Sequence, residues 1–171
     1  FLADPAALAA EVRAEAEALR AGRDPYAGRA GDWWLRVPAG EVAARLYAPA
    51  SIVADPARPA PLVIALHGAG GDENMFMEGY GVGEIRRLAD KHGFIVLSPR
   101  SEQAMGAPDW VREAVAFVGR FYAVDPDRVY AIGHSMGAGG AASMALNAPG
   151  VIAGAACIAG GPFAVPSKAG A

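Results

Sequence analysis

Apolar side chains near the start of the chain follow the spacing of one helix face. They recur at Leu8, Val12, Ala16 and Leu19. Asp4 and Pro5 suit the N-cap and first turn of such a helix, and Gly22 suits its end. The pattern predicts an N-terminal amphipathic helix within residues 1–22, with its apolar face packed on the surface of the domain.

The rest of the chain alternates short apolar runs with helical patterns. Residues 33–37 and 42–47, joined by a turn at 38–41, predict an antiparallel hairpin, and the Pro/Ala-rich residues 49–61 predict a loop. Further strands are predicted at 62–66, 94–97, 129–132 and 152–158, with helices at 75–91, 110–121 and 136–147. This alternation predicts one α/β domain over residues 1–171, with a mostly parallel sheet and helices on both faces.

One serine stands between two glycines where a predicted strand meets a predicted helix. The stretch RVYAIGHSMGAGGAA, residues 128–142, contains Gly133-x-Ser135-x-Gly137. In this context the motif predicts a nucleophile elbow, a tight turn whose glycines relieve collisions around a strained serine. The amide of Met136, at the helix N-terminus, would then stabilise an oxyanion.

Two phosphate-binding loops compete with the elbow for the same glycines. A Walker-type loop is excluded because no Gly-Lys-Ser/Thr ending is present. Gly137-x-Gly139-x-x-Ala142 satisfies a loose dinucleotide fingerprint, but its first glycine lies past the strand end, and no Asp or Glu follows Asp127 to bind a ribose. The elbow is therefore the favoured interpretation.

A second glycine-rich turn follows the strand at 62–66, in the stretch LHGAGGDEN. Turns at the carboxyl ends of parallel strands meet at one edge of the sheet, so this turn is expected beside Ser135. We predict that Ala69 supplies the second oxyanion amide, and that Gly70 and Asp72 contact substrate. The alternative is a glycine-rich turn with no catalytic role.

Both motifs resemble those of known hydrolases. PLVIALHGAGGDEN resembles carboxylesterase/phospholipase-type esterases, and VDPDRVYAIGHSMGAGGA resembles the polyhydroxybutyrate-depolymerase and feruloyl-esterase-like group. The resemblance spans residues 33–161 and implies an α/β-hydrolase fold. It also implies a serine esterase that forms an acyl-enzyme on Ser135, with a small-molecule ester as substrate and without metal or cofactor. A prolyl-oligopeptidase-like serine peptidase, which shares the elbow, is the alternative.

The chain departs from this resemblance after the serine. Such hydrolases place an acid and then a histidine beyond the nucleophile, but no Asp or Glu follows Asp127 and no His follows His134. We therefore expect that the C-terminal strands of the fold are missing and that this chain alone is nearly inactive. A missing C-terminal segment or a second chain would complete it, and the bare strand at 152–158 would favour a dimer. If the chain is complete, a non-catalytic scaffold is the alternative.

Three further side chains have open roles. Trp110 lines the substrate pocket or simply packs its helix, and His134 either contacts substrate or packs beneath the turn. His67 is expected to be a structural, hydrogen-bonding histidine.

Composition narrows the class of protein but not its compartment. Hydrophobic residues make up 53% and charged residues 19% of the chain, as in folded proteins, and the net charge of −3 without a basic stripe argues against nucleic acid. No apolar run is long enough to span a membrane. Cys157 is the only cysteine, so no internal disulfide can form. No signal peptide is visible, and the sequence does not distinguish a cytoplasmic from a secreted protein.

Overall fold

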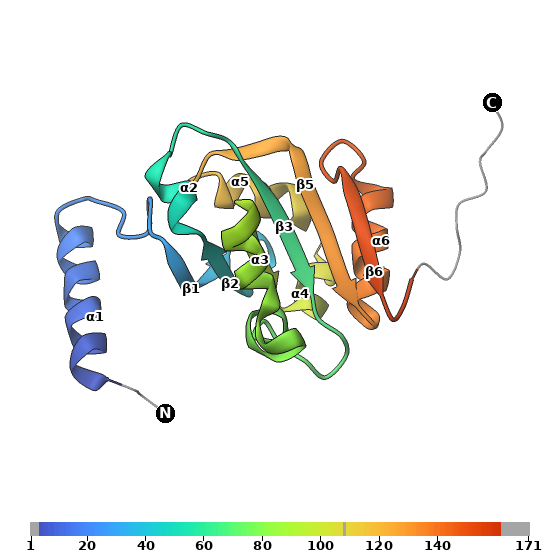
Figure 1. Ribbon diagram of the computed structural model, residues 1–171, viewed down its shortest axis with the longest axis horizontal. Coiled ribbons are helices and arrows are strands. Elements are labelled where there is room, and N and C mark those ends of the chain that lie inside the picture. Colours follow the sequence, from blue (N-terminus) through green and yellow to red (C-terminus); the bar gives the residue numbers. More distant parts are fainter. Residues whose placement is uncertain (1–3, 108, 162–171) are drawn as a thin grey trace.

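A mixed β-sheet forms the centre of the molecule (Figure 1). The computed structural model describes residues 4–107 and 109–161. Within these ranges the sheet has six strands in the order β1-β2-β4-β3-β5-β6. They are β1 (Gly31–Val37), β2 (Val42–Ala48), β3 (Ala60–Leu66), β4 (Ile95–Pro99), β5 (Val124–His134) and β6 (Gly154–Ile158). The predicted hairpin is confirmed: β2 pairs antiparallel with β1 and also with β4, whereas β4, β3, β5 and β6 are mutually parallel.

Helices cover both faces of the sheet, as predicted (Figure 1). On one face α3 (Glu84–His92) buries Ile85 and Ala89 against Ala65 and Val96. The opposite face carries α4 (Ser101–Gly106), α5 (Trp110–Val118) and α6 (Met136–Asn147). The sheet therefore separates two apolar clusters.

The two central strands explain why both glycine-rich turns meet. Leu62, Ile64 and Leu66 of β3 are fully buried on one face of the sheet and Ala65 is fully buried on the other, which fits a strand covered on both faces. The parallel register of β3 and β5 pairs Leu66 with Gly133. The turns that follow these two positions therefore leave the same edge of the sheet side by side.

The predicted helix at 75–91 is wrong in its first half. A π-turn (η2, Met75–Gly79) and a 3₁₀ turn (η3, Tyr80–Val82) precede α3. Gly81 and Gly83 have φ angles of 58° and 73°, and an added Cβ at Gly83 would overlap the carbonyl oxygen of Met77. These backbone conformations interrupt the helix, and only glycine adopts them without strain.

Two short helices were not predicted. They are α2 (Ala50–Ala54), within the predicted loop at 49–61, and α4, which follows β4. Five or six residues make too few turns for a hydrophobic period to show in the sequence.

The N-terminal helix forms as predicted but does not pack as predicted. At the start of α1 (Pro5–Arg20) the Asp4 carboxylate accepts hydrogen bonds from the backbone amides of Ala6 and Ala7, both at 3.0 Å. Val12 and Leu19 are nevertheless 55% and 62% exposed. The helix stands beside the sheet (Figure 1), where Arg29 pairs with Glu15 at 2.6 Å and Ala18 is buried. The face with Glu15 and Ala18, rather than the predicted apolar face, is thus the one in contact. Neither α1 nor another helix in residues 4–107 and 109–161 is long and apolar enough to cross a membrane.

Among the residues that the structure describes, β6 is the edge strand of the sheet beyond β5, and its residues 155–158 are exposed. Ile158 is 45% exposed. The sequence predicted this bare apolar edge; the dimer expected from it stays a prediction.

Candidate functional site

Ser135 lies in a strained turn between β5 and α6. Its φ and ψ angles are 53° and −115°, a conformation that non-glycine residues rarely adopt. An added Cβ at Gly133 would overlap the carbonyl oxygen of Gly137, and one at Gly137 would overlap that of Leu66. Only glycine fits at both positions, so the turn has the geometry that the motif predicts for a nucleophile elbow.

The serine turn is also fixed from the side of β6. The Ser135 amide donates a 2.9 Å hydrogen bond to the carbonyl oxygen of Ile158, and an added Cβ at Gly160 would lie 2.6 Å from the Ser135 carbonyl oxygen. Met136 is the first residue of α6. The first amides of a helix have no partner within it, so the Met136 N–H is suited to stabilise negative charge beside Ser135.

The glycine loop, residues 68–74, packs directly on this turn. An added Cβ at Gly68 would lie 3.2 Å from Ser135 Cβ and 3.0 Å from His134 Nδ1. Ala69 is exposed at the next position, and Gly70 has a φ angle of 77°. The fold therefore brings the two predicted oxyanion amides, of Ala69 and Met136, to the same edge of the sheet.

His67 fixes the start of the glycine loop. The ring is fully buried; its Nε2 accepts a 2.9 Å hydrogen bond from the Ser101 amide, and its Nδ1 lies 2.8 Å from the Gly68 carbonyl oxygen. Because Nε2 accepts, the proton is on Nδ1 and the ring is neutral. The Glu102 carboxylate, 3.6 Å from Nε2, therefore forms no ion pair with it. The histidine has the structural role that the sequence predicted.

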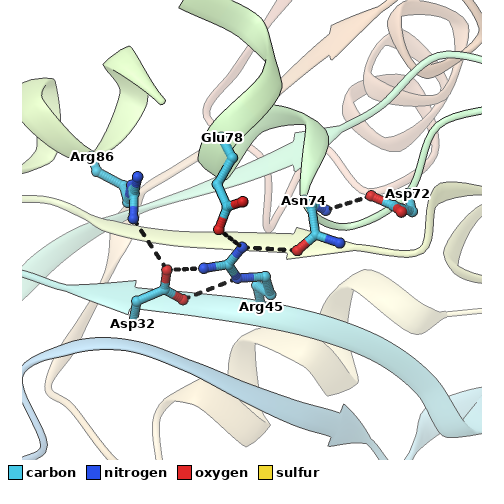
Figure 2. Close-up of polar contacts among 6 residues, drawn as sticks. All are labelled: Asp32, Arg45, Asp72, Asn74, Glu78 and Arg86. Atoms are coloured by element: carbon cyan, nitrogen blue, oxygen red, sulfur yellow. Dashed lines mark hydrogen bonds and ion pairs between the residues drawn. The ribbon is translucent and has the colours of Figure 1, made fainter. Parts of the chain in front are cut away.

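Arg45 fixes the end of the loop from β2 (Figure 2). Its Nη1 donates to Asn74 Oδ1 at 2.8 Å and to Glu78 Oε1 at 2.6 Å. Its Nε donates to Asp32 Oδ1 at 3.1 Å, and its Nη2 pairs with the other carboxylate oxygen of Asp32. The backbone N–H of Asn74 donates to Asp72 Oδ1 at 2.9 Å. One nearly buried guanidinium thus joins the hairpin, the glycine loop and η2.

The charges of this network reinforce one another. Burial by itself lowers the pKa of Arg45, but hydrogen bonds to Glu78 and Asp32 outweigh burial and raise that pKa above its ordinary value. The hydrogen bond from Arg45 lowers the pKa of Glu78. Both groups are therefore held in their charged forms.

A hollow of about 1090 Å³ opens beside Ser135, between α4, α5 and α6. Met105, Trp110 and Met144 contribute apolar walls. Ser143 and Asn147 supply a polar edge, with Asn147 Nδ2 donating to Ser143 Oγ at 3.0 Å. Its apolar lining and few polar groups are typical of small-molecule pockets.

The structure brings only some of the predicted site residues to this hollow. Ser135, Met136 and Trp110 line it; Trp110 is also 1% exposed, so it both packs α5 and forms a wall. The other candidates lie outside the lining: Ala69, Gly70, Asp72 and His134. Asp72 closes the glycine loop through Asn74, and His134 Nδ1 bonds to the Tyr80 hydroxyl at 3.1 Å. For these two side chains the geometry favours support of the turns over the predicted substrate contact.

The sequence did not identify Tyr80 or Arg45 as site residues. Tyr80 lies between two glycines, Gly79 and Gly81, and these could have indicated that the predicted helix is interrupted at Tyr80. Arg45 carries no such signal, because its partners lie 29 and 33 residues away. Among the residues that the structure describes, no His, Asp or Glu side chain hydrogen-bonds to the Ser135 hydroxyl.

Known proteins similar to this chain are ester hydrolases by name. No family model matches the chain. It is 31% identical over 122 residues to poly(3-hydroxyalkanoate) depolymerase C of Paucimonas lemoignei, covering 61% of this chain and 28% of the relative. The feruloyl esterase module of Clostridium thermocellum, solved with sinapinate, superimposes with a TM-score of 0.62 at 18% identity, over 84% of this chain and 58% of that one.

A third similar protein is the Staphylococcus aureus fluorophosphonate-binding serine hydrolase FphF. It superimposes with a TM-score of 0.59 at 21% identity, over 72% of this chain and 54% of that one. The chain spans less than two thirds of each of these three proteins. The structural likenesses confirm the predicted α/β-hydrolase fold.

Proposed function

We propose that this protein is a serine hydrolase that cleaves a carboxylic ester through an acyl-enzyme on Ser135. The observation that carries the proposal is the strained Ser135 turn, which meets the N-terminus of α6, the glycine loop and an apolar hollow at one point. The printed names of the similar proteins, a depolymerase, a feruloyl esterase and a serine hydrolase, support it.

The reaction has two steps with a balanced exchange of bonds. Ser135 Oγ bonds to the carbonyl carbon as a base takes its proton; the ester C–O bond breaks, and the alcohol leaves with a proton. Water then attacks the acyl-serine, releases the carboxylic acid and restores the Ser135 hydroxyl. Negative charge on the carbonyl oxygen in each step would be stabilised by the amides of Met136 and Ala69.

The hollow favours a substrate of a particular chemistry. Its apolar walls at Met105, Trp110 and Met144 suit an alkyl or aryl group, and the Ser143–Asn147 edge suits a hydroxyl or carbonyl on that group. Such a pocket would accept one side of an ester of moderate size while the scissile carbonyl lies at Ser135.

A fluorophosphonate probe and a chromogenic ester test the proposal. Because turnover needs a base at Ser135, both assays are run on the 171-residue chain and on the protein at its natural length. At natural length we expect labelling and p-nitrophenyl ester hydrolysis that Ser135→Ala abolishes, and in the 171-residue chain we expect both to be much weaker. The matched control is Ser51→Ala, an exposed serine on α2 away from the hollow, which should change neither.

Three results would overturn the proposal. Labelling that persists in Ser135→Ala would place the nucleophile elsewhere. Cleavage of peptide anilides in preference to esters would favour a serine peptidase. Neither labelling nor hydrolysis at natural length would favour a non-catalytic protein that keeps the fold.

A further inference from the structure

We propose that Tyr80 is a positioning residue that sets the spacing of the two oxyanion amides; the inference rests on the proposed function. Its hydroxyl lies between the two turns that carry those amides. The Gly68 amide donates to Tyr80 Oη at 3.3 Å, and Tyr80 Oη lies 3.1 Å from His134 Nδ1. Gly68 directly precedes Ala69, and His134 is two residues before Met136. One oxygen atom thus joins the glycine loop to the nucleophile turn.

The chemistry of these groups fixes the direction of the hydrogen bond from Gly68, whereas the direction of the bond to His134 depends on the tautomer of the ring. A backbone amide can only donate, so the hydroxyl oxygen accepts from Gly68 and its own proton remains free to donate. Within the described residues, the acceptor in reach of that proton is His134 Nδ1. His134 Nδ1 accepts this proton in the tautomer that carries its own proton on Nε2.

The broken helix before α3 holds the Tyr80 ring in place. Tyr80 follows the π-turn η2 directly, and its ring packs edge-on against Phe76 with 4.9 Å between centroids. On the other side it lies against the His134 ring, also at 4.9 Å. Since Phe76 belongs to the buried cluster under α3, the hydroxyl is supported by the core rather than by solvent-exposed side chains.

The hydroxyl has a function because the pairing of β3 with β5 ends at Leu66 and Gly133, and beyond that pair packing alone would hold the two turns together. Gly68 touches the serine turn by van der Waals packing, which resists compression but gives little resistance to separation. The two bonds through Tyr80 resist separation. An oxyanion needs both donors within about 2.7–3.1 Å, so a small opening weakens the stabilisation of the transition state more than ground-state binding.

Tyr80→Phe tests this role, because it removes the hydroxyl and keeps the packed ring. In the protein at its natural length, we expect kcat for p-nitrophenyl acetate to fall roughly tenfold with KM nearly unchanged, less than the 100-fold or greater loss from removing a direct oxyanion donor. The ¹⁵N signal of His134 Nδ1 should shift, and hydrogen exchange at the Gly68 amide should accelerate. The chain has three histidines, which makes the assignment tractable.

The matched control is Tyr47→Phe, which also removes one tyrosine hydroxyl with one side-chain partner, Asp90, at 2.7 Å. It should leave all three readouts as in the parent. The inference is overturned if Tyr80→Phe changes neither the His134 signal nor kcat, if the signal shifts while kcat does not, or if Tyr47→Phe has the same effects. If the parent hydrolyses no ester, the proposed function has failed; the His134 signal and the Gly68 exchange then decide by themselves whether Tyr80 joins the turns.

Discussion

The nucleophile turn and the glycine loop lie side by side, yet different forces hold them. In the turn, the backbone leaves no space for a Cβ at Gly133 or Gly137, and steric exclusion fixes its shape. The glycine loop instead depends on side chains from other elements: His67 at its start, Tyr80 at Gly68 and Arg45 at Asn74. The shape of the turn is set by close backbone contacts, whereas the loop keeps its shape only while side chains from other elements keep their bonds.

This difference predicts how each region responds to substitution. A steric constraint fails as soon as one atom is added, and no neighbour can compensate because the colliding atoms belong to the backbone. In a hydrogen-bonded loop each substitution removes the bonds of one side chain. The loss in the free energy of unfolding is therefore smaller, and it depends on which polar groups are left unpaired.

The largest effect is expected from Gly137→Ala. The new methyl group would overlap the Leu66 carbonyl oxygen and lie 2.6 Å from that of His67, so α6 would have to move away from β3. We expect a loss of at least about 3 kcal/mol in the free energy of unfolding. Urea denaturation followed by circular dichroism measures it.

Gly139→Ala is the control for that substitution. Gly139 lies in the same helix, and an added Cβ there meets no atom within 4 Å. Alanine at this position should stabilise the helix by about 0.5–1 kcal/mol. If Gly137→Ala were as stable as Gly139→Ala, steric exclusion would not be what shapes the turn.

Arg45→Met should have the next largest effect. Methionine fills part of the space but leaves Asp32 and Asn74 without their main partner. Breaking a buried pair costs about 3–5 kcal/mol, but Asp32 stays partly exposed and keeps Arg86 as a neighbour, so we expect about 2 kcal/mol. Thermal unfolding gives the stability, and proteolysis should cut first within residues 68–74.

The matched control is Arg36→Met on β1. Arg36 pairs with Glu41 at 3.4 Å, and both side chains are mostly exposed. Such a pair contributes at most about 1 kcal/mol. If Arg45→Met and Arg36→Met lowered the free energy of unfolding equally, Arg45 would not stabilise the loop.

The contrast between turn and loop also explains what the sequence predicted. The nucleophile turn and α6 were located correctly because the glycines, the serine and the apolar run before them are contiguous. Alternation of strands and helices also predicted a mostly parallel sheet, so the turns after β3 and β5 were expected at the same edge; that these two strands are neighbours is known from the structure. These features depend on local sterics and periodicity, which a single sequence displays.

The braces of the loop could not be predicted because they are contacts across the fold. Nothing in the sequence around Arg45 distinguishes it from an exposed arginine on a strand. Its burial depends on the position of η2, which carries its partner Glu78. The α1 helix gives the same lesson: its spacing identifies an apolar face but not whether anything covers it, and Leu8, Val12 and Leu19 are exposed. Tyr80 was not identified because a continuous helix was predicted at 75–91; the break before α3 depends on the positive φ angles of Gly81 and Gly83, which periodicity does not report.

His67→Phe should have a smaller effect than Arg45→Met. The phenyl ring occupies a similar volume but cannot accept from the Ser101 amide, which stays buried without a partner. An unpaired buried donor costs about 1–2 kcal/mol. His92→Phe, at the exposed end of α3, should change the free energy of unfolding by less than about 0.5 kcal/mol. Differential scanning calorimetry compares the stabilities of the two variants. If His67→Phe were as stable as the parent, the hydrogen bond from the Ser101 amide to His67 would not help to hold the loop against α4.

The smallest effect expected is a pH dependence from Glu78. Because the hydrogen bond from Arg45 lowers the pKa of this carboxyl, the folded state binds the proton less readily than the unfolded state. The stability that the pair contributes is therefore complete above the ordinary pKa of a glutamate and is lost as the pH falls through the lowered value. Glu78→Gln should unfold at a lower temperature than the parent at neutral pH, and the difference should vanish in acid. Glu17→Gln, on the exposed side of α1, should match the parent at every pH. A gap between Glu78→Gln and the parent that persists in acid would mean that the charge of Glu78 does not help to hold the loop.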